Sequence, residues 1–115
     1  MEGFVVSTTT DYVIMSQKQE LIAFAYDKRG KLLSVGRNSY IKSHPYQLRV
    51  ARKSGNPAKI YLHAEVDALI KARGKAVHKL VVMRYGKGGK WLNAKPCPSC
   101  EIAIREFRVR EVEHT

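Results

Sequence analysis

Apolar and polar positions follow two different spacings along this chain, and each spacing predicts a type of element. Two apolar runs of strand length, 21–26 and 31–36, lie on either side of a turn-forming Asp-Lys-Arg-Gly tetrapeptide at 27–30. This arrangement predicts an antiparallel hairpin. A third strand is predicted over 78–85, which has a continuously apolar centre. A last strand is predicted over 109–115, where apolar and charged residues alternate.

Helical spacing predicts the remaining elements. Apolar residues at i, i+3 and i+4 predict a helix over 63–73, followed by Gly74 as a helix-ending residue. Pro98 favours the first turn of another helix, over 99–107. A cluster of Ser, Thr and Asp residues near the N-terminus is a suitable cap for a short helix over 10–18.

The segment 38–60 is expected to be largely irregular, basic and polar, with a short helix around 47–53. Long loops in small domains are often functional, although a plain connector would have the same composition. The element order is therefore α-β-β-α-β-α-β, which predicts an α/β sandwich. Because the third and fourth strands are joined through a helix, a parallel pair is expected there.

Length and composition restrict the range of possible functions and cellular locations. We expect a single domain over 1–115, in the cytoplasm, because no apolar run approaches the roughly 20 residues that cross a bilayer and no secretory signal is recognisable. The formal net charge is +11, which predicts attraction to an anionic partner such as a nucleotide phosphate or a nucleic acid. A basic surface that only keeps the protein soluble is the alternative.

A group of metal-ligand residues is the strongest chemical signal. The chain has two cysteines, Cys97 and Cys100, in a C-x-x-C pattern, and His63 precedes them in a His-Ala-Glu sequence that ends at Glu65. One His and two Cys can hold Zn²⁺ and leave the fourth tetrahedral position open, as in catalytic sites. A zinc ribbon would need a second C-x-x-C pair. His63 and Glu65 can face one metal only if His63 lies at the start of its helix.

At these residues the chain resembles the zinc-dependent cytidine and deoxycytidylate deaminase superfamily, over nearly its whole length. Its Cys97-Pro98-Ser99-Cys100-Glu101-Ile102-Ala103-Ile104 stretch is similar to the C-P-x-C-x-x-A-I of deoxycytidylate deaminases, and Gly36-Arg37-Asn38 resembles the family's G-x-N. The long insertion of larger deoxycytidylate deaminases is missing, as in compact phage-type enzymes. The resemblance implies a three-layer α-β-α cytidine deaminase-like sandwich with a mixed sheet of four to five strands.

The resemblance also implies roles for individual residues. Zn²⁺ on His63, Cys97 and Cys100 would activate a water, and Glu65 would carry protons while a cytosine nucleotide, most readily deoxycytidylate, loses ammonia. Asn38 would contact the sugar and the backbone of Ala64 the base. The candidates for the 5′-phosphate, on loop position and charge alone, are Lys42, His44, Arg49 and Lys53.

Two other functional classes compete with this interpretation. One is a deaminase that acts on a base in DNA or RNA, which the net charge favours and which would need stacking aromatics. The aromatics that could serve are Tyr40, Tyr46, Tyr85 and Trp91. The other is a non-enzymatic nucleic-acid binder with a structural zinc and a fourth protein ligand. We also expect a homo-oligomer, in which neighbouring subunits complete a shallow pocket, and no membrane association.

Overall fold

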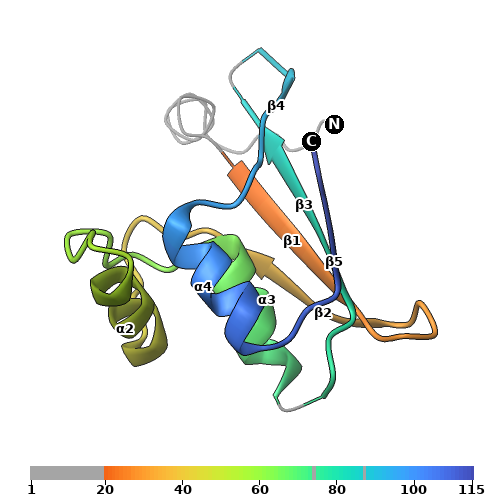
Figure 1. Ribbon diagram of the computed structural model, residues 1–115. Coiled ribbons are helices and arrows are strands. Elements are labelled where there is room, and N and C mark those ends of the chain that lie inside the picture. The colour runs from red at the N-terminus through yellow and green to blue at the C-terminus, as the bar shows by residue number, and fades with distance from the viewer. Residues whose placement is uncertain (1–19, 74, 87) are drawn as a thin grey trace.

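The computed structural model describes residues 20–73, 75–86 and 88–115. Within these ranges the chain forms five strands and three helices (Figure 1). The strands are β1 (Glu20–Tyr26), β2 (Leu32–Arg37), β3 (Lys79–Tyr85), β4 (Trp91–Leu92) and β5 (Glu111–His114). The helices are α2 (Pro45–Lys53), α3 (Ala64–Ala72) and α4 (Pro98–Glu106).

The strands form one mixed, mostly antiparallel sheet in the order β2-β1-β3, with β4 and β5 both on the far edge of β3. The predicted hairpin is confirmed, since β1 and β2 are antiparallel and Phe24 lies opposite Val35. The predicted parallel pair is also confirmed, with Leu80 of β3 opposite Val112 of β5. The two-residue strand β4 was not predicted and pairs with the other end of β3.

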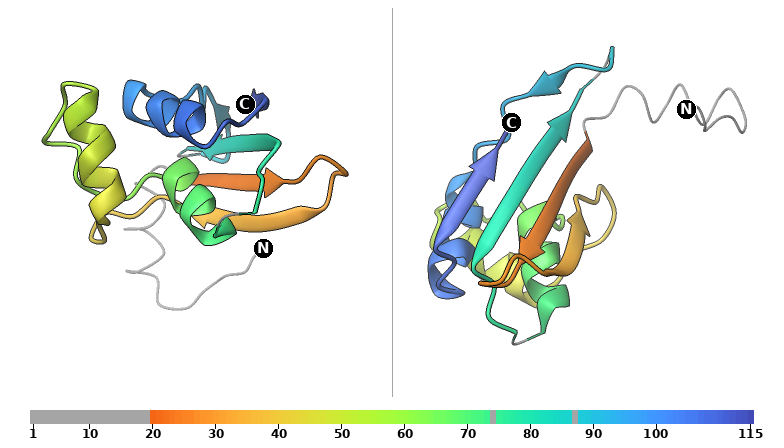
Figure 2. Two further views of the ribbon diagram at one scale, coloured as in Figure 1. Left: turned by 60° about the horizontal axis from the view of Figure 1, so that its bottom comes forward. Right: turned by 90° about the vertical axis from the view of Figure 1, so that its right-hand side faces the viewer.

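The three helices all lie on one side of the sheet, as the two views of Figure 2 show. Helix α3 packs on β1 and β2, α4 packs beside α3, and α2 packs on α4 at the outside. The described residues therefore form two layers. The helix predicted over 10–18 lies outside the described residues, so the second helical layer of the predicted sandwich stays an expectation.

The core lies between α3 and the helix-facing side of the sheet. Ala23 and Ala25 of β1 and Leu80 and Val82 of β3 are fully buried there. At Gly36 of β2 the strand approaches α3 so closely that an added Cβ would collide with the backbone of Ala64 and Ala68. Glycine at this position is therefore a requirement of packing, and small residues in β1 serve the same close approach.

The ends of the helices differ slightly from the predictions. Helix α2 begins at Pro45, two residues before the predicted start, because His44 caps it by accepting a hydrogen bond from the backbone N–H of Tyr46 (3.0 Å). Helix α3 ends at Ala72, and Arg73 adopts the left-handed conformation (φ 51°). The position predicted to end the helix, Gly74, is not among the described residues. In the described part of the chain, no helix has the length and apolar character needed to cross a bilayer.

Candidate metal centre

His63 lies immediately before α3, where its backbone is still extended (φ −86°, ψ 154°). Its carbonyl accepts the first hydrogen bond of the helix, from the N–H of Asp67 (2.9 Å), but its side chain caps no N–H of α3. The side chain is instead directed toward the two cysteines. This is the position that the sequence required if His63 and Glu65 are to face a common centre.

The two cysteines begin α4 in a matching way. Cys97 is the residue before the helix, with an extended backbone (φ −74°, ψ 169°), and Pro98 occupies the first helical position, as predicted. Cys100 follows one turn later and is fully buried, whereas Cys97 is half-buried. The starts of α3 and α4 therefore bring three potential ligands together from segments more than thirty residues apart.

The ligand atoms of His63, Cys97 and Cys100 all lie within 4.8 Å of one another. The Nδ1 atom of His63 is 3.3 Å from the Sγ atom of Cys100 and 3.4 Å from that of Cys97. A tetrahedral zinc with bonds of about 2.3 Å to sulfur and about 2.0 Å to nitrogen would hold such atoms roughly 3.5 Å apart. The donor set and its spacing therefore fit one Zn²⁺ ion.

The acidities of the two thiols are coupled. The pKa of Cys97 is lowered to about 3, first because the thiol of Cys100 donates a hydrogen bond to its sulfur and next because His63 does so too. The pKa of Cys100 is raised, because it is the donor of that hydrogen bond and is buried. A bound zinc ion deprotonates its thiol ligands outright.

Glu65 lies in the first turn of α3 and is only 3 % exposed. Burial raises its pKa above the ordinary 4.5, and the nearby charge of Cys97 acts in the same direction. A carboxyl group with a raised pKa is a better proton acceptor than an ordinary carboxylate, and carboxyl groups commonly serve as general acids and bases. Glu65 therefore has the chemical properties of a proton carrier beside the three ligands.

A cavity of about 540 Å³ opens onto the cluster. His63, Cys97 and Glu65 line it, and so do Ala64 and Asn38, the two residues expected to contact the base and the sugar. The side-chain oxygen of Asn38 accepts a hydrogen bond from the N–H of Leu21 (2.9 Å), which holds the residue at the rim. Its role and that of Ala64 stay predictions.

The four residues predicted to bind phosphate do not line this cavity. Arg49 and Lys53 both form ion pairs with Glu106 of α4, and His44 caps α2. Lys42 is exposed in the loop before α2, and its carbonyl accepts a hydrogen bond from the N–H of Leu62. The cations that do line the cavity are Lys59, Arg84 and Lys95, which sequence reasoning missed.

Helix α2 supports the cluster through two polar side chains that sequence reasoning also missed. Gln47 is fully buried; its Oε1 accepts a hydrogen bond from the N–H of His63 (3.1 Å) and its Nε2 donates one to the carbonyl of Lys59 (3.4 Å). The hydroxyls of Ser54 and buried Ser99 are hydrogen-bonded (2.9 Å), which joins the end of α2 to the first turn of α4. Nothing in the sequence distinguishes these residues from surface Gln and Ser.

The aromatic residues proposed for base stacking are scattered. Tyr40 lines the cavity. Tyr46 packs edge-on against Phe107 (ring centroids 5.4 Å apart) and donates a hydrogen bond to Glu106, so it is part of the α2–α4 contact. Tyr85 and Trp91 contact each other at 5.2 Å between ring centroids, with Trp91 58 % exposed.

No protein-family model matches the sequence, and no curated protein matches it. The assignment of the metal centre therefore depends on the residue types, spacing and burial of the cluster itself.

Proposed function

We propose that the protein is a zinc-dependent hydrolase that removes the amino group of a cytosine nucleotide, most readily deoxycytidylate. The observation that carries this proposal is the combination of three clustered ligand side chains with a buried carboxyl group, at a cavity whose wall includes His63, Cys97 and Glu65. Three protein ligands with an open fourth position are typical of catalytic zinc. The arrangement agrees with the H-x-E and P-C-x-x-C pattern of zinc deaminases.

The proposed chemistry is a hydrolysis. When bound, Zn²⁺ lowers the pKa of a coordinated water and so supplies a nucleophile near neutral pH. Glu65 would accept the proton that this water loses and pass it to N3 of the cytosine, and would then transfer the remaining proton of the new C4 hydroxyl group to the departing amine. A C–O bond forms at C4 and the C–N bond breaks, so the products are a uracil nucleotide and ammonia. The burial of Glu65 raises the pKa of its carboxyl group and so strengthens it as a proton acceptor.

The main non-enzymatic alternative is a structural zinc. Structural sites are almost always completed by a fourth protein ligand. In the described part of the chain, the cluster of His, Cys, Asp and Glu ligand atoms contains His63, Cys97 and Cys100 and no fourth member. This supports a catalytic rather than a structural site.

The cavity supports a small-molecule substrate. Its volume of about 540 Å³ lies within the roughly 300–1,000 Å³ of ordinary ligand pockets. Lys59 and Lys95 line its wall and add positive charge suited to the 5′-phosphate of a nucleotide. Of the four aromatics considered for a polynucleotide, only Tyr40 lines it. We therefore favour a mononucleotide over a base in DNA or RNA.

The deciding experiment measures ammonia release by the zinc-loaded protein. The substrates are deoxycytidine, cytidine, their monophosphates, adenosine and a cytosine-containing single-stranded oligomer. One charged hydrogen bond to phosphate contributes about 1.5–3 kcal/mol, so deoxycytidine monophosphate should exceed deoxycytidine roughly tenfold to a hundredfold in kcat/KM. If only the oligomer is deaminated, the polynucleotide alternative replaces this proposal. If no substrate releases ammonia, the enzyme proposal fails.

Single-residue variants identify the phosphate contacts. Lys59→Ala and Lys95→Ala test the cavity wall, and Lys42→Ala tests the loop position predicted from the sequence. A residue that binds the phosphate reduces kcat/KM for the monophosphate by about tenfold and leaves the rate with deoxycytidine unchanged. An equal loss with both substrates would instead indicate general damage to the pocket.

We also propose that the protein acts as a homo-oligomer. Exposed apolar side chains line the cavity, among them Ile60 and Tyr61, and Ile41 (84 % exposed) directly follows Tyr40 of the lining in the sequence. Such patches commonly mark contact surfaces. Light scattering should give a mass above that of one chain, and a fully active monomer of 13.1 kDa would contradict the proposal.

A further inference from the structure

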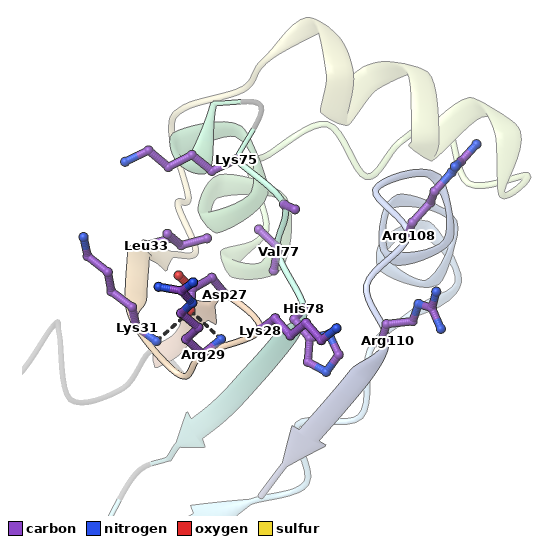
Figure 3. A pocket seen from close by; sticks show the side chains of 11 residues that line it. Asp27, Lys28, Arg29, Lys31, Leu33, Lys75, Val77, His78, Arg108 and Arg110 are labelled. Carbon is purple, nitrogen blue, oxygen red and sulfur yellow. Dashed lines mark hydrogen bonds between the residues drawn. The ribbon is translucent and has the colours of Figure 1, made fainter.

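A second cavity, of about 660 Å³, lies at the end of the sheet opposite the metal centre. Strand β1 connects the two regions, because Leu21 lines the metal-site cavity and Asp27, just after the strand, lines the second one. Leu21 and Asp27 are six residues apart, which at about 3.3 Å per residue separates the two regions by roughly 20 Å. The walls come from the β1–β2 turn, the segment after α3, and the segment between α4 and β5 (Figure 3). We call this cavity the basic cleft.

The lining of the basic cleft is strongly positive. It contains six Lys or Arg residues and one acidic residue, Asp27. All six cations are exposed, and within the described ranges none of them forms an ion pair. They are Lys28, Arg29, Lys31, Lys75, Arg108 and Arg110.

Asp27, the one acidic residue of the lining, has a structural role. The Oδ1 atom of Asp27 accepts hydrogen bonds from the backbone N–H groups of Arg29 and Lys31, both at 2.9 Å (Figure 3). Asp27 therefore stabilises the turn that contains three of the cations, Lys28, Arg29 and Lys31. The histidine of the cleft, His78, contacts Glu111 at 3.2 Å.

The cations are attached to a rigid frame. The N–H of His78 donates to the carbonyl of Tyr26 (2.8 Å), and the carbonyl of His78 accepts from the N–H of Arg110 (2.9 Å). The end of β1, the start of β3 and the start of β5 are thus tied together by backbone hydrogen bonds. Positive side chains from sequence segments about 80 residues apart are held around one opening.

Helix ends explain only part of this charge. Lys75 and Arg108 follow the C-terminal ends of α3 and α4, where cations are favourable because of the helix dipole alone. Lys28, Arg29 and Lys31 belong to a hairpin turn, and Arg110 precedes a strand. In the lining, Asp27 is the one acidic residue among six exposed cations, so the cleft has an excess of positive charge suited to an anionic ligand.

We propose that the basic cleft binds the phosphodiester backbone of a nucleic acid, at a site separate from the metal centre. The lining has several cations, and histidine is its only ring-bearing residue. Its chemistry therefore suits phosphates in sequence-independent contact and offers no aromatic platform for a base. Binding there does not require that the nucleic acid be a substrate of the metal centre.

The test measures binding of a labelled thymidine oligomer to the full, zinc-loaded chain by fluorescence anisotropy, at about 50 and about 200 mM salt. Thymine has no exocyclic amine, so the result is independent of deamination. The variant Lys28→Ala/Lys31→Ala/Arg110→Ala removes three cleft cations that do not follow a helix. The matched control, Arg52→Ala/Lys90→Ala/Arg105→Ala, removes three exposed cations that line neither cavity.

We expect the cleft variant to bind at least about tenfold more weakly at low salt, with the control close to the parent protein. The slope of log K against log salt should fall by about 2, because each phosphate contact on a single strand contributes about 0.7. Circular dichroism melting should show both variants folded. A matched duplex oligomer, measured in parallel, shows which form of the backbone the cleft prefers.

Three results would overturn the proposal. The first is equal weakening in the cleft and control variants, which would make binding a property of net charge alone. The second is no binding by the parent protein at low salt. The third is displacement of the oligomer by inorganic tripolyphosphate at an equal concentration of phosphate groups, which would make the cleft a site for a small anion instead.

Discussion

The two ends of the sheet use polar residues in opposite ways. At the candidate metal centre, the groups are few and none is exposed: Cys100 is fully buried, Glu65 nearly so, and His63 and Cys97 are partly buried. At the basic cleft, roughly 20 Å away along β1, six cations are exposed around a frame of backbone hydrogen bonds. The proposed function of the metal centre depends on atoms held at fixed separations. The proposed function of the basic cleft depends on its density of positive charge.

This difference determines how each end responds to change. A buried group with defined partners is costly to remove, because its partners lose their hydrogen bonds or ligand contacts in a place that water cannot reach. An exposed cation can be removed with little effect on folding, and its loss acts on a charged partner. The metal centre should therefore be sensitive to changes of a single atom or methyl group, and the cleft only to changes of charge.

The largest expected effect is on turnover by Glu65→Gln. The amide keeps the shape of the side chain but cannot accept the proton, and general acid–base catalysis contributes about 10²–10⁴-fold. We expect ammonia release to fall by that factor while zinc content stays near one ion per chain. Glu101→Gln, an exposed carboxylate on α4, is the matched control and should keep full activity. A Glu65→Gln protein with parental turnover would remove Glu65 from the mechanism.

Next in size is the effect of Gly36→Ala on stability. The new methyl group meets the backbone of α3, and overpacking of this kind costs about 1–3 kcal/mol. The entropic gain from replacing a glycine is only about 0.4–1 kcal/mol, so the net effect is destabilising by about 1–2 kcal/mol. Urea denaturation measures it.

Lys31→Ala at the basic cleft is the comparison for this variant. It should change the free energy of unfolding by less than about 0.5 kcal/mol, as exposed sites usually do. If Gly36→Ala proves harmless, then β2 and α3 are not packed as closely as described. If the two variants are equally destabilised, the contrast between the two ends is wrong.

The smallest expected effect is on the pH dependence of stability. It comes from Glu106, which links α2 to α4. Ion pairing with Lys53 and a hydrogen bond from Tyr46 lower its pKa from 4.5 to about 2. Because this pKa is lowered in the folded state, its stabilising contribution is complete above about pH 5 and is lost as the pH falls toward 2. The side chain is 28 % exposed and its partners more so, hence the contribution should be only about 1 kcal/mol.

Denaturation of Glu106→Gln at several pH values tests this link. The variant should be less stable than the parent at pH 7, and the difference should shrink as the pH falls from about 5 toward 2, because the parent carboxyl becomes protonated over this range. Glu101→Gln should show no such convergence. A difference that persists at low pH would mean that Glu106 acts through packing and not through its charge.

Local sequence patterns were sufficient to predict the hairpin and the convergence of the three ligand residues. The turn at 27–30 predicts the hairpin because Asp27 and Gly30 satisfy it without help from elsewhere. The spacing of His63, Cys97 and Cys100 relative to two helix starts likewise predicts their convergence, because each ligand lies beside its own helix-start signal.

Features that depend on residues far away in the sequence could not be predicted from local sequence patterns. Helix α2 is stabilised by Glu106, more than fifty residues away, so the sequence indicates the helix only weakly and suggests phosphate binding for cations that pair with that carboxylate. Gln47 acquires its role only when the chain folds back toward His63. The basic cleft is assembled from three separate segments, each of which is an ordinary surface stretch in isolation.

The most direct test of the central claim measures zinc and activity in the same sample. The purified chain should contain about one zinc ion and should release ammonia from deoxycytidine monophosphate. A chelator should remove the metal and the activity together, and added Zn²⁺ should restore both. The claim is contradicted if the metal-free chain is equally active, or if the fully zinc-loaded chain releases no ammonia from any cytosine nucleotide.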